Sequence, residues 1–280
     1  MKQYQAFTKR FLLLLTPWIA SSVLAASPSQ AATLALSEGV VEFTRFSQSP
    51  STVDTNVDTN TVINNDLVNA LANAEATFIL APPTAFNSSF NIALGKGTNY
   101  LGQAESEATV IGNFDVDAGT PFSFDFTAGL NVATSIDNPP PIGVREDATA
   151  SGDISFVLLD TANDSVLDFF SLVGNVTSED DSDFIGFQKS ENVTLSNPIK
   201  TSDFKGNEES ATAFVQGSLQ RSFAKKTNLT LIEVKRNNAI VTARTPEPSS
   251  ILALLSCCGV IGVVLKSRRK ETVLGCSLKR

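Results

Sequence analysis

The chain has no histidine among its 280 residues, and its other reactive side chains are scarce. The absence of histidine excludes Ser-His-Asp and Cys-His catalysis and removes the commonest protein ligand of zinc and iron. All three cysteines, Cys257, Cys258 and Cys276, lie near the C-terminus, so residues 32–244 contain neither a disulfide nor a thiol nucleophile. We therefore predict a protein that is not an enzyme, with carboxylate chemistry as the one hydrolytic route that the composition leaves open.

Tryptophan and tyrosine are also rare. Sugar sites commonly stack a pyranose face on an indole or phenol ring. The single tryptophan is Trp18, in an N-terminal apolar segment. Tyr100 is the lone candidate for such stacking in residues 32–244, with an ordinary loop aromatic as the plainer interpretation. Phenylalanine is abundant, but it alternates with polar residues and is interpreted as core. A glycan-binding adhesin or lectin is therefore an alternative hypothesis rather than the main one.

The charge is strongly acidic. Residues 33–244 contain 12 Lys and Arg against 27 Asp and Glu, a net charge of −15. Such a surface repels the phosphates of nucleic acids, so nucleic acid is excluded as a partner. The same charge suits solubility and loose association with divalent cations outside the cell.

Two acidic segments were considered as calcium sites. Four carboxylates follow one another closely at Glu179, Asp180, Asp181 and Asp183. They form a candidate weak Ca²⁺ site, with a solvated acidic loop as the plainer interpretation. A second segment alternates oxygen ligands at Asp54, Asn56, Asp58 and Asn60. An EF-hand is rejected there, because Thr59 replaces the glycine that the loop needs at its sixth position and Asn65 replaces the glutamate at its twelfth.

The apolar periodicity indicates an all-β fold. Residues 122–127 alternate phenylalanine with polar residues, and residues 110–116 alternate likewise, so the turn at 117–121 predicts a hairpin. A second hairpin is predicted to join 154–159 to 166–173, and further strands are predicted at 211–223, 229–234 and 239–243. Many short strands of this kind predict one antiparallel β-sandwich, jelly-roll or Ig-like, over residues 32–244. Residues 62–76 are an exception to the strand pattern, because Ile63, Leu67, Val68 and Leu71 have helical spacing. The three prolines at 139–141 predict a stiff exposed loop within the one domain.

The N-terminus has the pattern of a secretory signal peptide. Lys2, Lys9 and Arg10 precede an apolar stretch, and small residues then lead to Ser29-Gln30-Ala31. We predict a signal peptide over 1–31 that is cleaved after Ala31, with cleavage after Ala25 as the alternative. An uncleaved N-terminal anchor is disfavoured, because the apolar stretch is short and contains Pro17.

The C-terminal tail, residues 245–280, has three parts. Pro246, Glu247 and Pro248 precede an uncharged apolar run at 249–265, which is followed by a basic cluster at Lys266, Arg268, Arg269 and Lys270. The apolar run would form about 25 Å of helix. This length reaches the lower limit for crossing a bilayer, with the basic cluster snorkelling and holding that end in the cytoplasm. The tail thus predicts one transmembrane helix over 249–265, with residues 32–244 on the far side of the membrane.

These three parts resemble the PEP-CTERM sorting tail of exported bacterial proteins, including many from cyanobacteria. The resemblance implies recognition of Pro246, Glu247 and Pro248 by an exosortase-type processing enzyme. It also implies delivery to the cell surface or the extracellular polysaccharide matrix, with at least transient membrane anchoring. Here ten residues follow the basic cluster, more than is usual for such tails, and a plain single-pass anchor is the alternative. The function expected from the whole sequence is that of a structural surface or matrix protein. The alternatives are a glycan-binding adhesin and a carboxylate-based glycan hydrolase.

Overall fold

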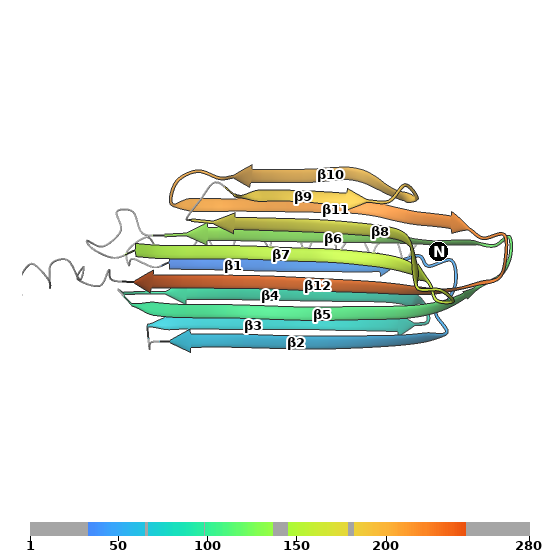
Figure 1. Cartoon of the computed structure of the whole chain (residues 1–280), viewed down its shortest axis with the longest axis horizontal. Helices are drawn as coiled ribbons and strands as arrows, with labels where there is room; N and C mark the ends of the chain where they lie inside the picture. Colours follow the sequence, from blue (N-terminus) through green and yellow to red (C-terminus); the bar gives the residue numbers. More distant parts are fainter. Residues whose placement is uncertain (1–32, 65–66, 98, 137–144, 179–181, 245–280) are drawn as a thin grey trace, which may run out of the picture.

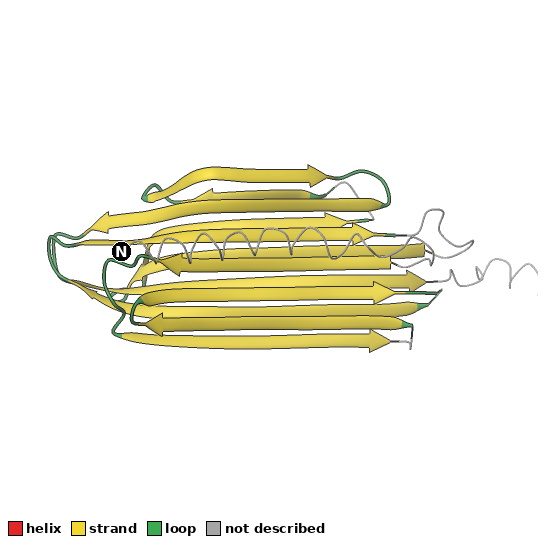
Figure 2. Ribbon diagram, turned by 180° about the vertical axis from the view of Figure 1, so that it is seen from behind, coloured by secondary structure: helices red, strands yellow, loops and turns green. Residues whose placement is uncertain are grey.

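The computed structural model describes residues 33–64, 67–97, 99–136, 145–178 and 182–244, and all regular structure in these ranges is β-strand (Figure 1). One sheet has the strand order β10 (Val193–Asp203), β11 (Glu208–Ser222), β6 (Pro121–Ser135), β1 (Thr33–Thr44), β4 (Pro83–Gly95) and β3 (Val68–Leu80). The second sheet has the order β2 (Thr52–Asn64), β5 (Tyr100–Val116), β12 (Thr227–Arg244), β7 (Arg145–Asp160), β8 (Ser165–Thr177) and β9 (Phe184–Lys189). We call these the β1 sheet and the β12 sheet. Their strands pair antiparallel and run nearly alongside one another in the two layers (Figure 2). The prediction of an all-β fold of two antiparallel sheets is confirmed.

Alternation of side chains explains why these segments form strands. In β6, Phe122, Phe124 and Phe126 are at most 2% exposed, while the polar residues between them are only partly buried. Successive side chains of a strand point to opposite faces, so this pattern directs one row into the sandwich and the other outward. β5, β7 and β12 show the same alternation over most of their length.

The sandwich core changes character along the strands. One end is aromatic, with Phe126 packed against Phe156 and Phe170 at ring-centroid distances of 5.1 and 5.0 Å. The other end contains small residues, such as Ala93 and Ala239, both fully buried. Between the two ends lies a polar belt of inward-facing side chains, each at most 5% exposed: Ser37, Asn87, Ser89, Asn91, Ser106, Glu233, Lys235 and Asn237. The core is thus interrupted by polar groups at mid-length.

The predicted hairpin of 110–116 with 122–127 is wrong. These residues form β5 and β6, which lie in different sheets, since β5 pairs with β2 and β12 whereas β6 pairs with β1 and β11. The turn at 117–121 therefore carries the chain from one layer to the other. Both strands have an apolar face, and the two faces pack against each other, with the Phe114 and Phe122 ring centroids 4.8 Å apart.

The second predicted hairpin is confirmed, because β7 pairs with β8 and Leu159 lies opposite Val166. The predicted helix at 62–76 is wrong, since the described residues there belong to β2, β3 and the turn before β3. In β3, alanines take every second position, and the whole strand pairs with β4, so the apparent helical spacing reflects two separate strands. The strands predicted at 229–234 and 239–243 are a single strand, β12.

Candidate functional site

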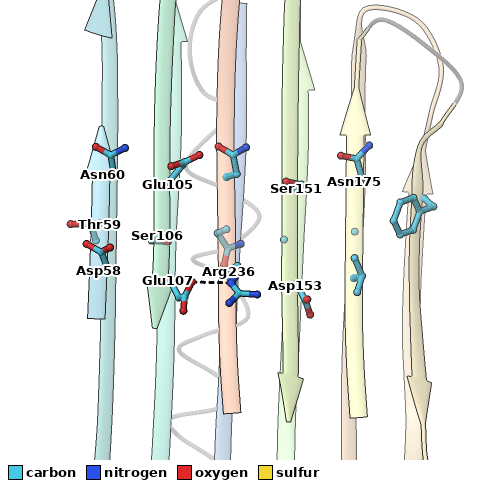
Figure 3. A pocket seen from close by; sticks show the side chains of 16 residues that line it. Asp58, Thr59, Asn60, Glu105, Ser106, Glu107, Ser151, Asp153, Asn175 and Arg236 are labelled. Carbon is cyan, nitrogen blue, oxygen red and sulfur yellow. Dashed lines mark hydrogen bonds and ion pairs between the residues drawn. The ribbon is translucent and has the colours of Figure 1, made fainter. Parts of the chain in front are cut away.

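A shallow groove of about 570 Å³ crosses the middle of the outer face of the β12 sheet (Figure 3). Strands β2, β5, β12, β7, β8 and β9 all contribute to its wall. The side chains that point outward into it are mostly polar: Asp58, Asn60, Glu105, Glu107, Ser151, Asp153, Asn175, Arg236 and Asn238, with Phe184 as the one aromatic residue.

Strand register arranges these side chains in two rows across the sheet. In the first row, which we call the charged row, pairing places Asp58 opposite Glu107, Glu107 opposite Arg236 and Arg236 opposite Asp153. The second row, two residues further along each strand, is the amide row and runs through Asn60, Glu105, Asn238, Ser151, Asn175 and Phe184. Neighbours in a row are roughly 4.8 Å apart, the spacing of adjacent strands. The backbone therefore holds every group of the groove at a regular interval.

The charged row is dominated by one ion pair. Arg236 Nε lies 2.8 Å from Glu107 Oε2, and this hydrogen bond raises the pKa of Arg236. Both side chains are largely exposed, so the pair adds little to stability and can exchange partners with a ligand. Asp153 differs, because burial raises the pKa of its carboxyl, against an opposing effect of the Arg236 charge.

Two acceptor atoms of the groove are not engaged by the protein. Within the described ranges, Asp153 Oδ1 and Asn238 Oδ1 are buried and have no hydrogen-bond partner. Buried polar atoms without a partner are uncommon in folded proteins, because their desolvation is not offset. Asp153 and Asn238 lie on adjacent strands, one in each row, and each of these acceptors becomes available to a ligand only when its side chain turns outward.

The polar belt lies directly behind the groove. Asn237, which comes between Arg236 and Asn238, points inward, and its Nδ2 donates to Ser37 Oγ at 2.5 Å. Asn91 Nδ2 donates to the Asn237 carbonyl at 2.5 Å, and the Ser89 hydroxyl donates to Asn237 Oδ1. These bonds connect β12 to β1 and β4 through the core, so the groove floor is fixed from behind.

A buried triad of Lys235, Asn87 and Glu233 occupies the adjacent part of the belt. Lys235 Nζ donates to Asn87 Oδ1 at 2.5 Å, and Asn87 Nδ2 donates to Glu233 Oε2 at 2.6 Å. Burial raises the pKa of Glu233 to about 8, and burial lowers the pKa of Lys235 to about 7. Both shifts favour the uncharged forms, as expected for ionisable groups enclosed in a sandwich core.

Tyr100, the lone candidate for sugar stacking and more plainly interpreted as a loop aromatic, is a buried strand residue. Tyr100 is the first residue of β5 and is only 4% exposed. Its hydroxyl donates to Thr33 Oγ1 at 2.6 Å, so both its ring and its polar tip are engaged inside the protein. The aromatic surface that a ligand meets at the groove is Phe184, which is 47% exposed.

Most other residues that the sequence singled out lie outside the described ranges. This holds for Ala31, for Glu179, Asp180 and Asp181, and for the whole tail from Pro246 to Lys270. Asp183 is described, and its Oδ1 accepts a hydrogen bond from the Thr177 backbone N–H at 2.7 Å. No set of three or more Cys, Asp or Glu side chains in the described residues is grouped closely enough to hold a metal ion. Helices long and apolar enough to cross a membrane are likewise absent from those residues.

The acidic segment that was rejected as an EF-hand contributes to the groove instead. It forms β2, where alternate residues face outward and Asp58 and Asn60 reach the two rows. The polar belt was missed in the sequence, although a signal was present, since Glu233, Lys235 and Asn237 have the same parity as the apolar residues on either side of them in β12.

The groove therefore presents carboxylates, amides and one arginine on rigid strands, above a hydrogen-bonded core. Such groups act as paired donors and acceptors for hydroxyl-bearing ligands. No family model, curated protein or solved structure matches this chain.

Proposed function

We propose that this chain is an exported structural protein of the bacterial surface or extracellular matrix, and that its groove binds neutral glycan chains. The proposal includes a cleaved signal peptide over 1–31 and a sorting tail over 245–280 that an exosortase-type enzyme recognises. It also includes a jelly-roll-like assignment for the sandwich, supported by the repeated passage of the chain between the two sheets. The observation that carries the binding function is the pair of regular rows of polar side chains that line the groove, among which Arg236 and Glu107 are largely exposed.

The shape and charge of the groove favour a neutral polymer. The amide row runs across six strands, a distance of roughly 24 Å, so it suits an oligomer rather than a single sugar. Four carboxylates, Asp58, Glu105, Glu107 and Asp153, outnumber the single Arg236, so anionic polymers are repelled. Carboxylates and amides accept hydrogen bonds from sugar hydroxyls, and Phe184 at the β9 end offers an apolar ring face.

Binding is tested by comparing two asparagines on the outer face of β12. Asn238 lies in the amide row, whereas Asn228 is exposed on the same strand and does not line the groove. We expect saturable binding of a neutral polysaccharide such as xylan or a β-glucan in affinity electrophoresis, with no binding of alginate. Asn238→Ala should weaken binding about three- to tenfold, the value of one hydrogen bond, and Asn228→Ala should leave it unchanged. Equal effects of the two substitutions, or preference for alginate, would contradict the proposal.

Glycan hydrolysis is a second candidate, because Asp153 has a raised pKa and Glu107 shares its row. Their Cα atoms are about 10 Å apart, two strand spacings. Inverting glycosidases hold their two carboxyl groups about 6.5–9.5 Å apart around a water molecule, a separation that side chains on strands two positions apart are able to reach. Arg236 lies between the two carboxylates and forms an ion pair with Glu107. Because Glu107 is already paired, this arrangement favours ligand binding over activation of a water molecule. Release of reducing ends from the bound polysaccharide, abolished by Asp153→Asn, would establish hydrolysis and displace the binding proposal.

Export is tested by intact mass spectrometry of the native protein from washed cells and from spent medium. We expect a mature chain that begins at Ala32 and ends within 246–248. A chain that still ends at Arg280 would show that the tail serves as an anchor without processing. A chain that still begins at Met1 would contradict signal-peptide cleavage.

A further inference from the structure

The buried triad of Lys235, Asn87 and Glu233 places an amine, an amide and a carboxyl group in hydrogen-bonded contact, and it connects the two sheets. Asn87 belongs to β4 of the β1 sheet, and Lys235 belongs to β12 of the other. All three side chains are fully buried. We propose that Lys235 and Asn87 join in an intramolecular isopeptide bond, with Glu233 as the proton-transfer group, so that a covalent cross-link connects the two sheets.

The geometry places nucleophile and electrophile in contact. Lys235 Nζ lies 2.5 Å from Asn87 Oδ1. The carbonyl bond is about 1.2 Å long, so Cγ lies within about 3.7 Å of Nζ, close to the roughly 3–3.5 Å of a near-attack arrangement. Groups held this close react with effective molarities many orders of magnitude above those of free reactants. The Asn87 amide is also correctly oriented, because its Nδ2 faces two acceptors, Glu233 Oε2 at 2.6 Å and the Ala108 carbonyl at 3.0 Å.

The protonation states support the same chemistry. A lysine attacks as the neutral amine, and the lowered pKa of Lys235, about 7, makes that form abundant near neutrality. A carboxyl group assists as the protonated acid, and the pKa of Glu233, about 8, retains its proton at the same pH. Burial raises the pKa of Glu233 most, Lys235 and Asn87 lower it, and the charge of Asp153 on the outer face adds a smaller increase.

The reaction balances without any further reactant. The lone pair of Lys235 Nζ forms a bond to Asn87 Cγ, and the bond from Cγ to Nδ2 breaks. Glu233, which contacts Nδ2, gives its proton to the departing nitrogen and receives one from the attacking amine. The products are an amide between the two side chains and one molecule of ammonia. The site is closed to solvent, so water does not compete with the amine for Cγ.

Neighbouring residues leave space for this arrangement. A Cβ at Gly39 of β1 would lie 2.9 Å from Lys235 Cδ, so glycine there leaves room for the lysine side chain. Residues 32–244 contain no cysteine, so a disulfide cannot connect the sheets, whereas an amide needs no oxidant.

Tryptic mapping of the full-length protein tests the proposal. Trypsin would release Asn87 within peptide 46–96, and cross-linked Lys235 would resist cleavage and remain in peptide 227–236. We expect one branched peptide of these two segments, about 17 Da lighter than their sum because ammonia is lost. Detection of both segments only as separate, linear peptides from folded protein would overturn the proposal. Cyclisation of Asn87 onto its own backbone also loses ammonia, but it leaves the two segments unlinked and would likewise overturn it.

Variants separate the three roles. Lys235→Met should abolish the branched peptide. Glu233→Gln retains the size of the side chain but has no acidic proton, so it should reduce the yield of branched peptide at least tenfold. Circular dichroism would first show that this variant is folded. Lys189→Met is the control and should leave the branched peptide intact, because Lys189 Nζ donates to the backbone carbonyls of Ser190 and Val193 and lies outside the triad. Wild-type chains that have not folded, such as those taken from inclusion bodies and kept in concentrated urea, should lack the link, since the reaction depends on the fold. A branched peptide that persists undiminished in Glu233→Gln would refute the role of Glu233.

Discussion

Gly152 lies where the groove and the polar belt meet, and replacing it by alanine tests whether the two are coupled. Its backbone lines the groove floor, but a Cβ there would point into the core. That atom would collide with the side chain of Leu130 and lie 2.8 Å from Asn237 Nδ2. Leu130 is 1% exposed and Asn237 is bonded to Ser37, so neither side chain has room to retreat.

The expected cost follows from three contributions. Overpacking a close-packed core costs about 1–3 kcal/mol. Displacing Asn237 from Ser37 costs about 1 kcal/mol more. Alanine also restricts the unfolded chain more than glycine does, and this offsets about 0.4–1 kcal/mol of the lost stability. We therefore expect Gly152→Ala to lower the free energy of unfolding by about 2 kcal/mol and Tm by roughly 4–8 °C.

Urea unfolding monitored by circular dichroism provides the measurement, with a second glycine as the control. A Cβ at Gly186 of β9 would meet nothing within 4 Å, so Gly186→Ala should be neutral or slightly stabilising. Gly152→Ala should also weaken glycan binding, because Asn237 lies between Arg236 and Asn238 in the chain. Equal stability of the two variants would show that the core accommodates a methyl group at Gly152 and would refute the coupling.

Three further predictions concern the charged groups. Arg221→Met should lower the free energy of unfolding by about 3 kcal/mol, because Asp168, whose side chain is 1% exposed, would lose the guanidinium 3.0 Å away. Arg236→Met, at an exposed ion pair, should lower it by less than about 1 kcal/mol. Similar losses for the two variants in urea unfolding would contradict this. Glu233 has a folded pKa of about 8 against an ordinary value of 4.5, so the folded chain keeps a proton that the unfolded chain releases. Its contribution to stability should be full below pH 4.5 and decline as the pH rises to about 8, and Glu233→Gln should flatten that decline in a pH series; an unchanged slope would refute the assignment. A cross-link between Lys235 and Asn87, 148 positions apart, would stabilise the fold by about 5 kcal/mol through loop closure. Lys235→Met should therefore lower the free energy of chemical unfolding by that amount or more. A much smaller loss would indicate that the native chain is not linked.

Local sequence patterns predicted the strands well and their partners poorly. The alternation of Phe122, Phe124 and Phe126 with polar residues is a property of neighbouring residues, and it correctly identified β6. The same pattern does not specify whether an adjacent strand lies beside it or across the core. The hairpin of β7 with β8 was predicted correctly, whereas β5 and β6, joined by a similar turn, lie in opposite sheets.

The candidate site was inaccessible to sequence reasoning for a related reason. Asp58, Glu107, Arg236 and Asp153 are far apart in the chain, and only the register of four strands aligns them in one row. Likewise, Lys235 meets Asn87 only because two sheets pack face to face. Neither residue is unusual by itself in a polar stretch of sequence.

Composition and alternation by themselves determined that this is an acidic, histidine-free chain whose central part forms β-strands, since these properties need no knowledge of distant residues. They also support the predicted export signals at the two ends. The tertiary structure alone decided that polar residues of β4 and β12 are buried, that their pKa values shift, and that carboxylates and amides gather in one groove. The physical reason is that strand pairing and sheet packing join residues over long separations, and burial of an ionisable group becomes visible only when both sheets are in place.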